Sequence, residues 1–144
     1  MIVHAGLLAL WSGGGWRGVL VEGPSGSGKS DVAIRCLDQG FRLVADDRVL
    51  LWVSEGRLFG RAPDALSGLV EVRGIDVLIE PALRFAEVIL EVGAGAPDRV
   101  AADTFVERLG VVLPRLDLPL TEPSAPAKLR RAVARFDGVA KRGI

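Results

Sequence analysis

The chain has 144 residues, of which 49% are hydrophobic and 25% are charged, a composition typical of folded globular proteins. Basic and acidic residues number 18 each, so this neutral chain has no bulk attraction for nucleic acid or for an anionic membrane. Charges or glycines interrupt every apolar run short of the ~20 residues that a membrane-spanning helix needs, and the single cysteine excludes an internal disulfide. We therefore expect one cytoplasmic domain, residues 1–144, and the high mean hydropathy of +0.34 is consistent with a buried subunit interface.

In chain order, the first half is predicted to contain a strand (2–11), a glycine-rich turn (12–18), a buried strand (18–22), a helix (29–38), a strand (41–45) and a hairpin (49–62). Apolar positions of the helix, such as Val32 and Cys36, fall on one face, and Gly40 stands just beyond its end. The hairpin is expected to turn at Glu55 and Gly56.

The second half is predicted to contain a loop with a helical turn (63–68), strands (69–74 and 85–93), a short helix (104–109), an extended edge segment (112–120) and a C-terminal helix (124–138). Ser124 is expected to cap the last helix, with Leu129 and Val133 on its apolar face and a basic, solvated face opposite. One crossover among several hairpins indicates an α/β fold with a mixed sheet rather than a regular doubly wound one.

Residues 23–30, GPSGSGKS, match the phosphate-binding loop pattern G-x-x-x-x-G-K-[ST] at every fixed position. Glycines let consecutive backbone N–H groups point into one concavity, and the following helix adds the positive end of its dipole. In such a loop Lys29 reaches the β- and γ-phosphates, and the hydroxyl of Ser30 binds Mg²⁺. With ATP and Mg²⁺ as the expected cofactors, the predicted nucleotide-binding residues are Gly23, Pro24, Ser25, Gly26, Ser27, Gly28, Lys29 and Ser30.

Two adjacent aspartates, Asp46 and Asp47, follow the strand that comes directly after the loop helix. Ionised carboxylates at such a strand end repel each other unless a cation or a substrate hydroxyl relieves them. Their position next to a phosphate-binding loop therefore favours a role in phosphoryl transfer over turn formation or capping. The sequence leaves two roles open for Asp46, which are sharing the metal ion and orienting Arg48.

A further charged pair, Glu71 and Arg73, lies in the predicted strand at 69–74. Because side chains alternate along a strand, both are expected on the same face, where they suit a metal ion and the phosphates that it bridges. Taken alone, a Glu-x-Arg pattern is more typical of a surface ion pair.

Three segments in this order, GPSGSGKS, GFRLVADDRV and GRAPDALSGLVEVRG, resemble the catalytic domain of HPr kinase/phosphorylase. The similarity runs almost without gaps over residues 18–74 and continues more weakly to Pro119. The family consists of bacterial protein-serine kinases with a P-loop fold related to phosphoenolpyruvate carboxykinase. The resemblance therefore implies a mixed sheet with a P-loop helix and a C-terminal helix, assembled into a hexamer.

The resemblance also implies roles for single residues. Asp47 matches the aspartate that accepts the proton of the target serine, and Lys29 matches the lysine that neutralises the transferred phosphoryl group. His4 matches an active-site histidine, although the connection that follows it is longer here, and Arg99 matches an arginine near the phosphates. The implied catalytic residues are thus Asp47, Lys29, His4 and Arg99, and the implied metal ligands are Ser30, Glu71 and Asp46.

Three departures from the family pattern bear on activity. The chain resembles the short form of the family, which lacks an N-terminal domain. After the EVRG segment the chain continues as IDVLIEP without a further glycine turn, so the substrate-facing loop is expected to be reshaped. The segment PLTEPSAPAKL lacks the arginines that the family ties to dephosphorylation, so we expect kinase activity with weak or absent phosphorylase activity.

The leading hypothesis is an ATP- and Mg²⁺-dependent kinase for a serine of an HPr-like phosphocarrier protein of the phosphotransferase system, which would regulate carbon or nitrogen metabolism. One alternative is a P-loop kinase for a small metabolite, although a chain of 144 residues leaves little room for the usual arginine-bearing lid. The other is a non-catalytic ATP-binding module, against which the intact Lys29, Ser30, Asp47 and Glu71 argue, because a decayed site would be free to lose them.

Overall fold

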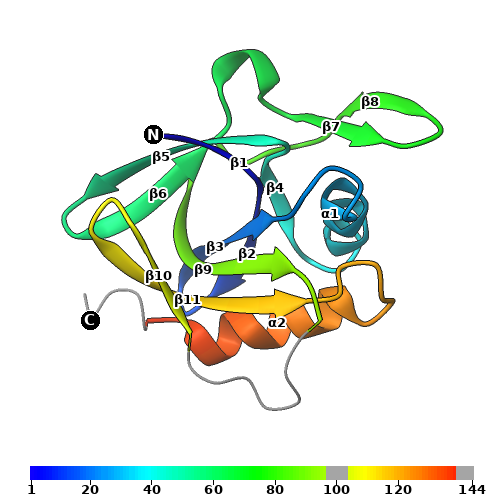
Figure 1. The fold of residues 1–144 in the computed structure, drawn as a ribbon. Coiled ribbons are helices and arrows are strands. Elements are labelled where there is room, and N and C mark those ends of the chain that lie inside the picture. The colour runs from blue at the N-terminus through cyan, green and yellow to red at the C-terminus, as the bar shows by residue number, and fades with distance from the viewer. Residues whose placement is uncertain (97–103, 139–144) are drawn as a thin grey trace.

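The computed structural model describes residues 1–96 and 104–138, in which a curled mixed sheet packs against two α-helices (Figure 1). The strands are β1 (Ile2–His4), β2 (Gly6–Ser12), β3 (Gly15–Glu22), β4 (Arg42–Ala45), β5 (Arg48–Ser54), β6 (Arg57–Arg61), β7 (Leu69–Val72), β8 (Asp76–Ile79), β9 (Ala86–Ala94), β10 (Phe105–Arg108) and β11 (Val111–Leu118). The helices are α1 (Lys29–Leu37) and α2 (Ala125–Phe136), with a 3-10 turn, η1, at Asp64–Leu66. The predicted α/β class with a mixed sheet is confirmed.

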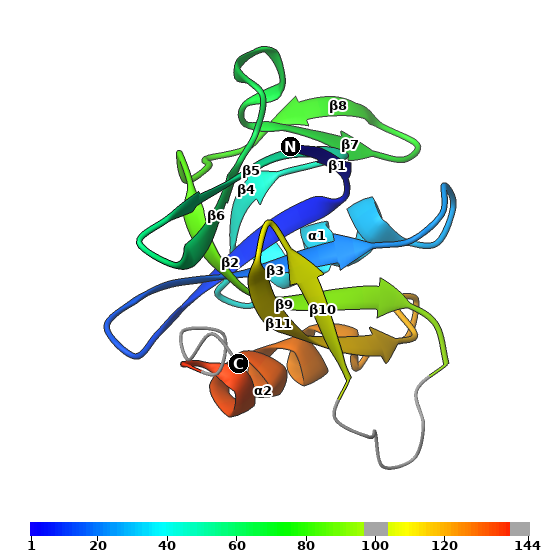
Figure 2. The same cartoon turned by 60° about the vertical axis from the view of Figure 1, so that its left-hand side comes forward.

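The main sheet follows the order β1-β5-β6-β9-β3-β2-β4, and β11 lies beside β9 with β10 on its other side. The central strand β9 runs parallel to β3, and on its other edge it pairs first with β6 and then with β11. This change of partner along one edge branches the sheet and accompanies its curl (Figure 2). The remaining pair, β7 and β8, forms a separate two-stranded sheet.

Both faces of the central strands are buried, which explains their near-continuous apolar sequence. On one face, Val19 and Ile89 pack with Cys36 of α1 and Leu129 of α2. On the other face, Leu20 belongs to a second cluster formed with strands of the curled sheet. Burial also raises the pKa of the Cys36 thiol to about 12, so this cysteine acts as a small apolar core residue. Among the described residues, no helix is of a length and hydropathy that would cross a membrane.

Three sequence predictions about elements need correction. The glycine-rich turn is shorter than expected, because Trp16 and Trp11 pair across a β2–β3 hairpin that turns at residues 13–14. The segment predicted as a short helix at 104–109 is instead strand β10, which pairs antiparallel with β11. The edge position predicted for β11 is confirmed, since it borders β10 at residues 111–114 and β9 at residues 115–118. Ser124 does occupy the N-cap position of α2, but its side chain makes no capping hydrogen bond.

Gly18 marks the closest approach of β3 to β9. A Cβ atom there would lie 2.7 Å from the backbone carbonyl oxygen of Glu87, whereas a Cβ at Gly6 would lie 3.7 Å from its nearest neighbour. We expect Gly18→Ala to lower the free energy of unfolding by about 1–3 kcal/mol, because two central strands must separate. Gly6→Ala is the matched control, and urea denaturation of both variants measures the difference. Equal stabilities would contradict this account.

Candidate active site

The phosphate-binding loop connects β3 to α1 at the carboxyl end of the central strands (Figure 1). Gly28 caps α1 with φ of 97°, a left-handed conformation that favours glycine, and its carbonyl oxygen accepts the N–H of Val32 at 2.8 Å. The first N–H groups of α1 come before this hydrogen bond and have no partner within the helix, so they remain available to an anion. The strand–loop–helix context that the motif requires is therefore present.

The ammonium group of Lys29 folds back over this loop. Its Nζ donates hydrogen bonds to the carbonyl oxygens of Gly23 and, at 3.4 Å, Pro24. The positive charge thus lies on the side of the loop where phosphate oxygens bind in P-loop proteins.

Asp46 joins three elements at the site. Its Oδ1 accepts a hydrogen bond from Ser30 Oγ of α1 at 3.0 Å, and its Oδ2 accepts one from the backbone N–H of Glu71 in β7 at 3.1 Å. Burial raises the pKa of Asp46, and the negative charges of Asp47 and Glu71 raise it further, against these two hydrogen bonds. Of the two roles left open by the sequence, the contact with Ser30 fits metal sharing. The side chain of Arg48 pairs with Asp47 instead, at 3.2 Å, so the alternative role of Asp46, orienting Arg48, is wrong.

Asp47 lies beside Asp46 but presents its carboxylate to solvent. Its φ of 72° is unusual for a residue other than glycine, and its side chain is 54% exposed. His4 Nε2 lies 2.5 Å from Asp47 Oδ1, because β1 pairs with β5 and sets His4 opposite Arg48. A histidine and an arginine therefore hold the two oxygens of a carboxylate that stays accessible to solvent.

Hard oxygen ligands for Mg²⁺ lie next to the loop, since the Ser30 hydroxyl and the Asp46 carboxylate are already in contact. Their fit to a cation rests on this donor chemistry and on the raised pKa of Asp46, because a cation would offset the crowding of negative charge. The described residues contain no group of three or more acidic, histidine or cysteine side chains arranged to hold a metal. One or two carboxylates are typical of Mg²⁺ that is also bound by phosphates.

The predictions for Arg73, Glu71 and Arg99 have different outcomes. Arg73 does not share a strand face with Glu71, because β7 ends at Val72 and Arg73 belongs to the turn. Glu71 is exposed and next to Asp46 through its backbone. Arg99 lies outside the described residues.

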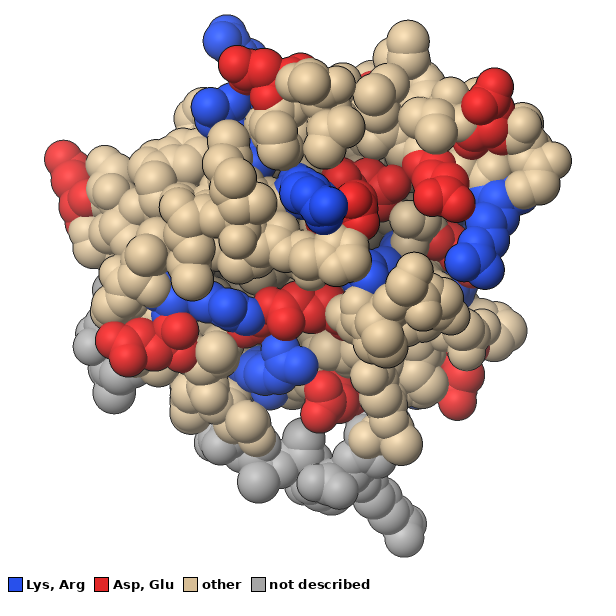
Figure 3. All heavy atoms as spheres, turned by 45° about the horizontal axis from the view of Figure 1, so that its top comes forward, with Lys and Arg blue, Asp and Glu red and all other residues tan. Residues whose placement is uncertain are grey.

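On the face in Figure 3, acidic and basic side chains alternate without one sign dominating, as the neutral composition leads one to expect.

A buried charge network next to the loop was missed from the sequence. Glu22, immediately before the loop, and the fully buried Glu91 both accept hydrogen bonds from Arg108, and Arg115 lies 3.3 Å from Glu91. These residues come from β3, β9, β10 and β11, which converge at this end of the sheet (Figure 2). The available signal was a glutamate within the apolar run of β9, a position that only a paired charge occupies.

Glu22 and Glu91 lie close enough to shift each other's pKa. Burial, together with the hydrogen bond and the charge of Glu91, raises the pKa of Glu22 from its ordinary 4.5 to about 7. Burial would also raise the pKa of Glu91, but hydrogen bonds from Glu22 and Arg108 and the nearby arginine charges lower it. The second carboxylate oxygen of Glu91 is buried and accepts no hydrogen bond within residues 1–96 and 104–138.

We expect Glu22→Gln to change how stability depends on pH. A carboxyl with a raised pKa binds more protons in the folded state, so its contribution to the free energy of unfolding falls as pH rises from 4.5 to about 7. The amide cannot ionise, so the variant should gain stability relative to the native protein between pH 5 and pH 8. Urea denaturation at these two pH values measures the gain, with Glu55→Gln in the exposed β5–β6 turn as control. A stability difference that is the same at both pH values would refute the raised pKa of Glu22.

The phosphate-binding loop lies between a strand and a helix, and a serine of that helix contacts an aspartate at a nearby strand end. These features define a P-loop protein. Residues 2–82 match the model of the HPr Serine kinase C-terminal domain, and the chain belongs to that family.

Named relatives agree with this assignment. The chain is 41% identical over 75 residues to an HPr kinase/phosphorylase of Clostridium tetani, covering 52% of this chain and 25% of that protein. It is 34% identical over 117 residues to the HPr kinase/phosphorylase of Clostridium novyi, covering 72% and 38%. The chain therefore spans well under half the length of these curated relatives. The structure of the Hpr(Ser) kinase/phosphatase from Coxiella burnetii superposes with a TM-score of 0.78 at 23% identity, covering 92% of this chain and 93% of that one, which shows a common fold.

Proposed function

We propose that residues 1–144 form one catalytic domain, related in fold to phosphoenolpyruvate carboxykinase, that transfers the γ-phosphoryl group of ATP to a serine of an HPr-like phosphocarrier protein. The observation that supports this most is the meeting of Ser30, Asp46 and Asp47 beside the phosphate loop. Family membership supports a cytoplasmic protein of the phosphotransferase system and a hexameric assembly.

In this proposal the loop residues 23–30 bind the phosphates through backbone N–H groups, and Lys29 exchanges its bonds to loop carbonyl oxygens for bonds to phosphate oxygens. Ser30 and Asp46 would hold Mg²⁺, with Glu71 as a further ligand, and the ion would neutralise charge on the transferred group. Arg99 would add positive charge near the phosphates. Each of these groups stabilises charge that spreads over the phosphoryl oxygens in the transition state.

Asp47 is proposed to accept the proton of the acceptor serine. In the same step the serine oxygen bonds to the γ-phosphorus, and the bond between that phosphorus and ADP breaks. A serine hydroxyl is a poor nucleophile at neutral pH, so positioning and charge neutralisation contribute more than a strong base. The contact from His4 at 2.5 Å and the ion pair with Arg48 fix the orientation of the Asp47 carboxylate. His4 is thus a positioning residue for the base in this scheme.

The reverse, phosphate-dependent reaction is proposed to be weak or absent. Residues 119–129 contain no arginine that could contact a phosphate. Arg35 donates hydrogen bonds to two backbone carbonyl oxygens of this segment, those of Leu120 and Glu122. Incubating a phosphoserine carrier with the protein and inorganic phosphate tests this directly. Efficient release of pyrophosphate would overturn it.

The kinase proposal is tested by incubating the protein with γ-labelled ATP, Mg²⁺ and a purified HPr-like carrier, followed by mass spectrometry of the carrier. We expect one phosphoserine, absent from a carrier whose acceptor serine is alanine. Transfer only to a small molecule would favour a metabolite kinase. Tight ATP binding with no transfer would favour a non-catalytic module.

A further inference from the structure

The β7–β8 hairpin leaves an apolar surface uncovered. β8 is exposed along its whole length, and within the described residues it pairs only with β7. Ile75 is 73% exposed, Val77 54% and Ile79 83%. The hairpin projects from the body of the molecule (Figure 1). An exposed apolar strand with a free edge is a surface that proteins normally cover.

The same hairpin is acidic. Glu71, Asp76 and Glu80 oppose the single positive charge of Arg73. None of the three carboxylates forms an ion pair within residues 1–96 and 104–138, and Asp76 only accepts a local hydrogen bond from the N–H of Val77. A surface that covers this hairpin therefore needs apolar contacts together with positive charge.

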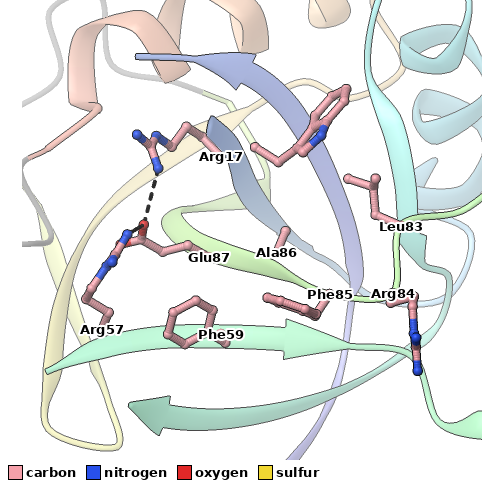
Figure 4. A pocket seen from close by; sticks show the side chains of 9 residues that line it. Arg17, Arg57, Phe59, Leu83, Arg84, Phe85, Ala86 and Glu87 are labelled. Carbon is pink, nitrogen blue, oxygen red and sulfur yellow. Dashed lines mark hydrogen bonds and ion pairs between the residues drawn. The ribbon is translucent and has the colours of Figure 1, made fainter. Parts of the chain in front are cut away.

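A groove of the opposite character lies where β3 and β9 begin, at the far end of these strands from the phosphate loop. One hollow of about 390 Å³ is lined by Trp16, Arg17, Arg57, Phe59, Leu83, Arg84, Phe85, Ala86 and Glu87 (Figure 4). A second, of about 410 Å³, shares Arg84 and Phe85 and adds Trp52 and Arg61. Trp52 stacks on Phe59 at 5.8 Å, and Phe85 packs against both rings at 6.1 Å while remaining 55% exposed.

Arginines outnumber acidic residues in this groove. Arg17 and Arg57 both point to Glu87, at 3.4 and 2.7 Å, and so neutralise that buried carboxylate (Figure 4). Arg61 pairs with an aspartate of η1. Arg84 is exposed and makes no ion pair with any residue that the structure describes. Aromatic rings with adjacent arginines are the composition typical of the centres of protein interfaces.

We propose that the β7–β8 hairpin of one copy of this chain docks in the arginine and aromatic groove of a second copy, with Ile79 against Phe85 and Glu80 facing Arg84. The two surfaces match in both apolar character and charge, although the chain as a whole is neutral. They do not cover each other within one chain, since Ile79 and Phe85 are both exposed. The contact therefore forms between copies.

Each contact joins the hairpin of one copy to the groove of another, so two different surfaces meet in it. It also adjoins the candidate active site, since Val77 lies directly opposite Glu71 in the hairpin register, and the backbone of Glu71 bonds to Asp46. The inference names the surfaces that meet. It rests on the self-assembly in the proposed function, and it holds whichever acceptor the site phosphorylates.

The test uses two exposed substitutions in the full chain, Ile79→Asp in the hairpin and Arg84→Glu in the groove, with Leu109→Asp as control. Leu109 is 47% exposed in the β10–β11 turn and outside both surfaces. Sedimentation velocity over a range of concentrations measures assembly, and circular dichroism checks that each variant is folded. We expect the native chain and the control to assemble, and each of the two variants to dissociate about tenfold or more readily.

Mixing the two variants gives the decisive result. The Arg84→Glu copy retains its hairpin and the Ile79→Asp copy retains its groove, so an equal mixture should form a heterodimer that dissociates less readily than the assembly of either variant alone. A native chain that stays monomeric would overturn the proposal. So would assembly that both variants leave unchanged, or a mixture that fails to associate.

Discussion

Replacing Asp47 with asparagine is expected to lower the rate of phosphoryl transfer to the carrier serine by about 10²–10⁴-fold, the usual contribution of a positioned general base. The amide is the same size and can still contact His4 and Arg48, but it cannot take a proton. Because Asp47 is half exposed and its amide variant keeps its neighbours, folding and ATP affinity should remain unchanged. The measurements are transfer from labelled ATP and ATP binding by calorimetry.

Asp64→Asn is the matched control for this variant. Asp64 also pairs with an arginine, at 2.8 Å, and is 96% exposed, but it lies in η1 away from the phosphate loop. Its substitution should leave the transfer rate near the native value. If Asp47→Asn transfers phosphate as fast as the native protein, the proton acceptor is another group, and the assignment of Asp47 is wrong.

Replacing Lys29 with methionine is expected to weaken ATP binding by about 10–100-fold, because one charge-assisted contact to phosphate contributes about 1.5–3 kcal/mol. The loss in transfer should be larger still, since the ammonium group also opposes charge that develops in the transition state. Methionine retains the length of the side chain while removing its charge. Calorimetry with ATP and transfer to the carrier separate the two effects.

Lys128→Met provides the control, since this lysine is exposed on α2 and only faces Glu122 at 3.5 Å. Neither binding nor transfer should change there. An unchanged ATP affinity in Lys29→Met would mean that the loop does not hold phosphates in the expected manner. Loss of transfer with intact binding would confine the role of Lys29 to the chemical step.

Much of the fold followed from local patterns. The apolar run of β9, the face of α1 that contains Cys36 and the turn at Glu55 and Gly56 were predicted, because strand, helix and turn preferences act over a few neighbouring residues. The error at 104–109 arose because β10 is short and is a strand only through its pairing with β11. The length of the β2–β3 hairpin was likewise set by cross-strand pairing rather than by its glycines.

The phosphate loop could be recognised from the sequence alone, because eight consecutive residues carry both its backbone shape and its chemistry. The tertiary structure decided which distant charges meet. Pairing of β1 with β5 sets His4 against Asp47, and convergence of four strands buries Glu22 with Glu91. Such contacts depend on the register of strands far apart in the chain, and local preferences do not encode that register.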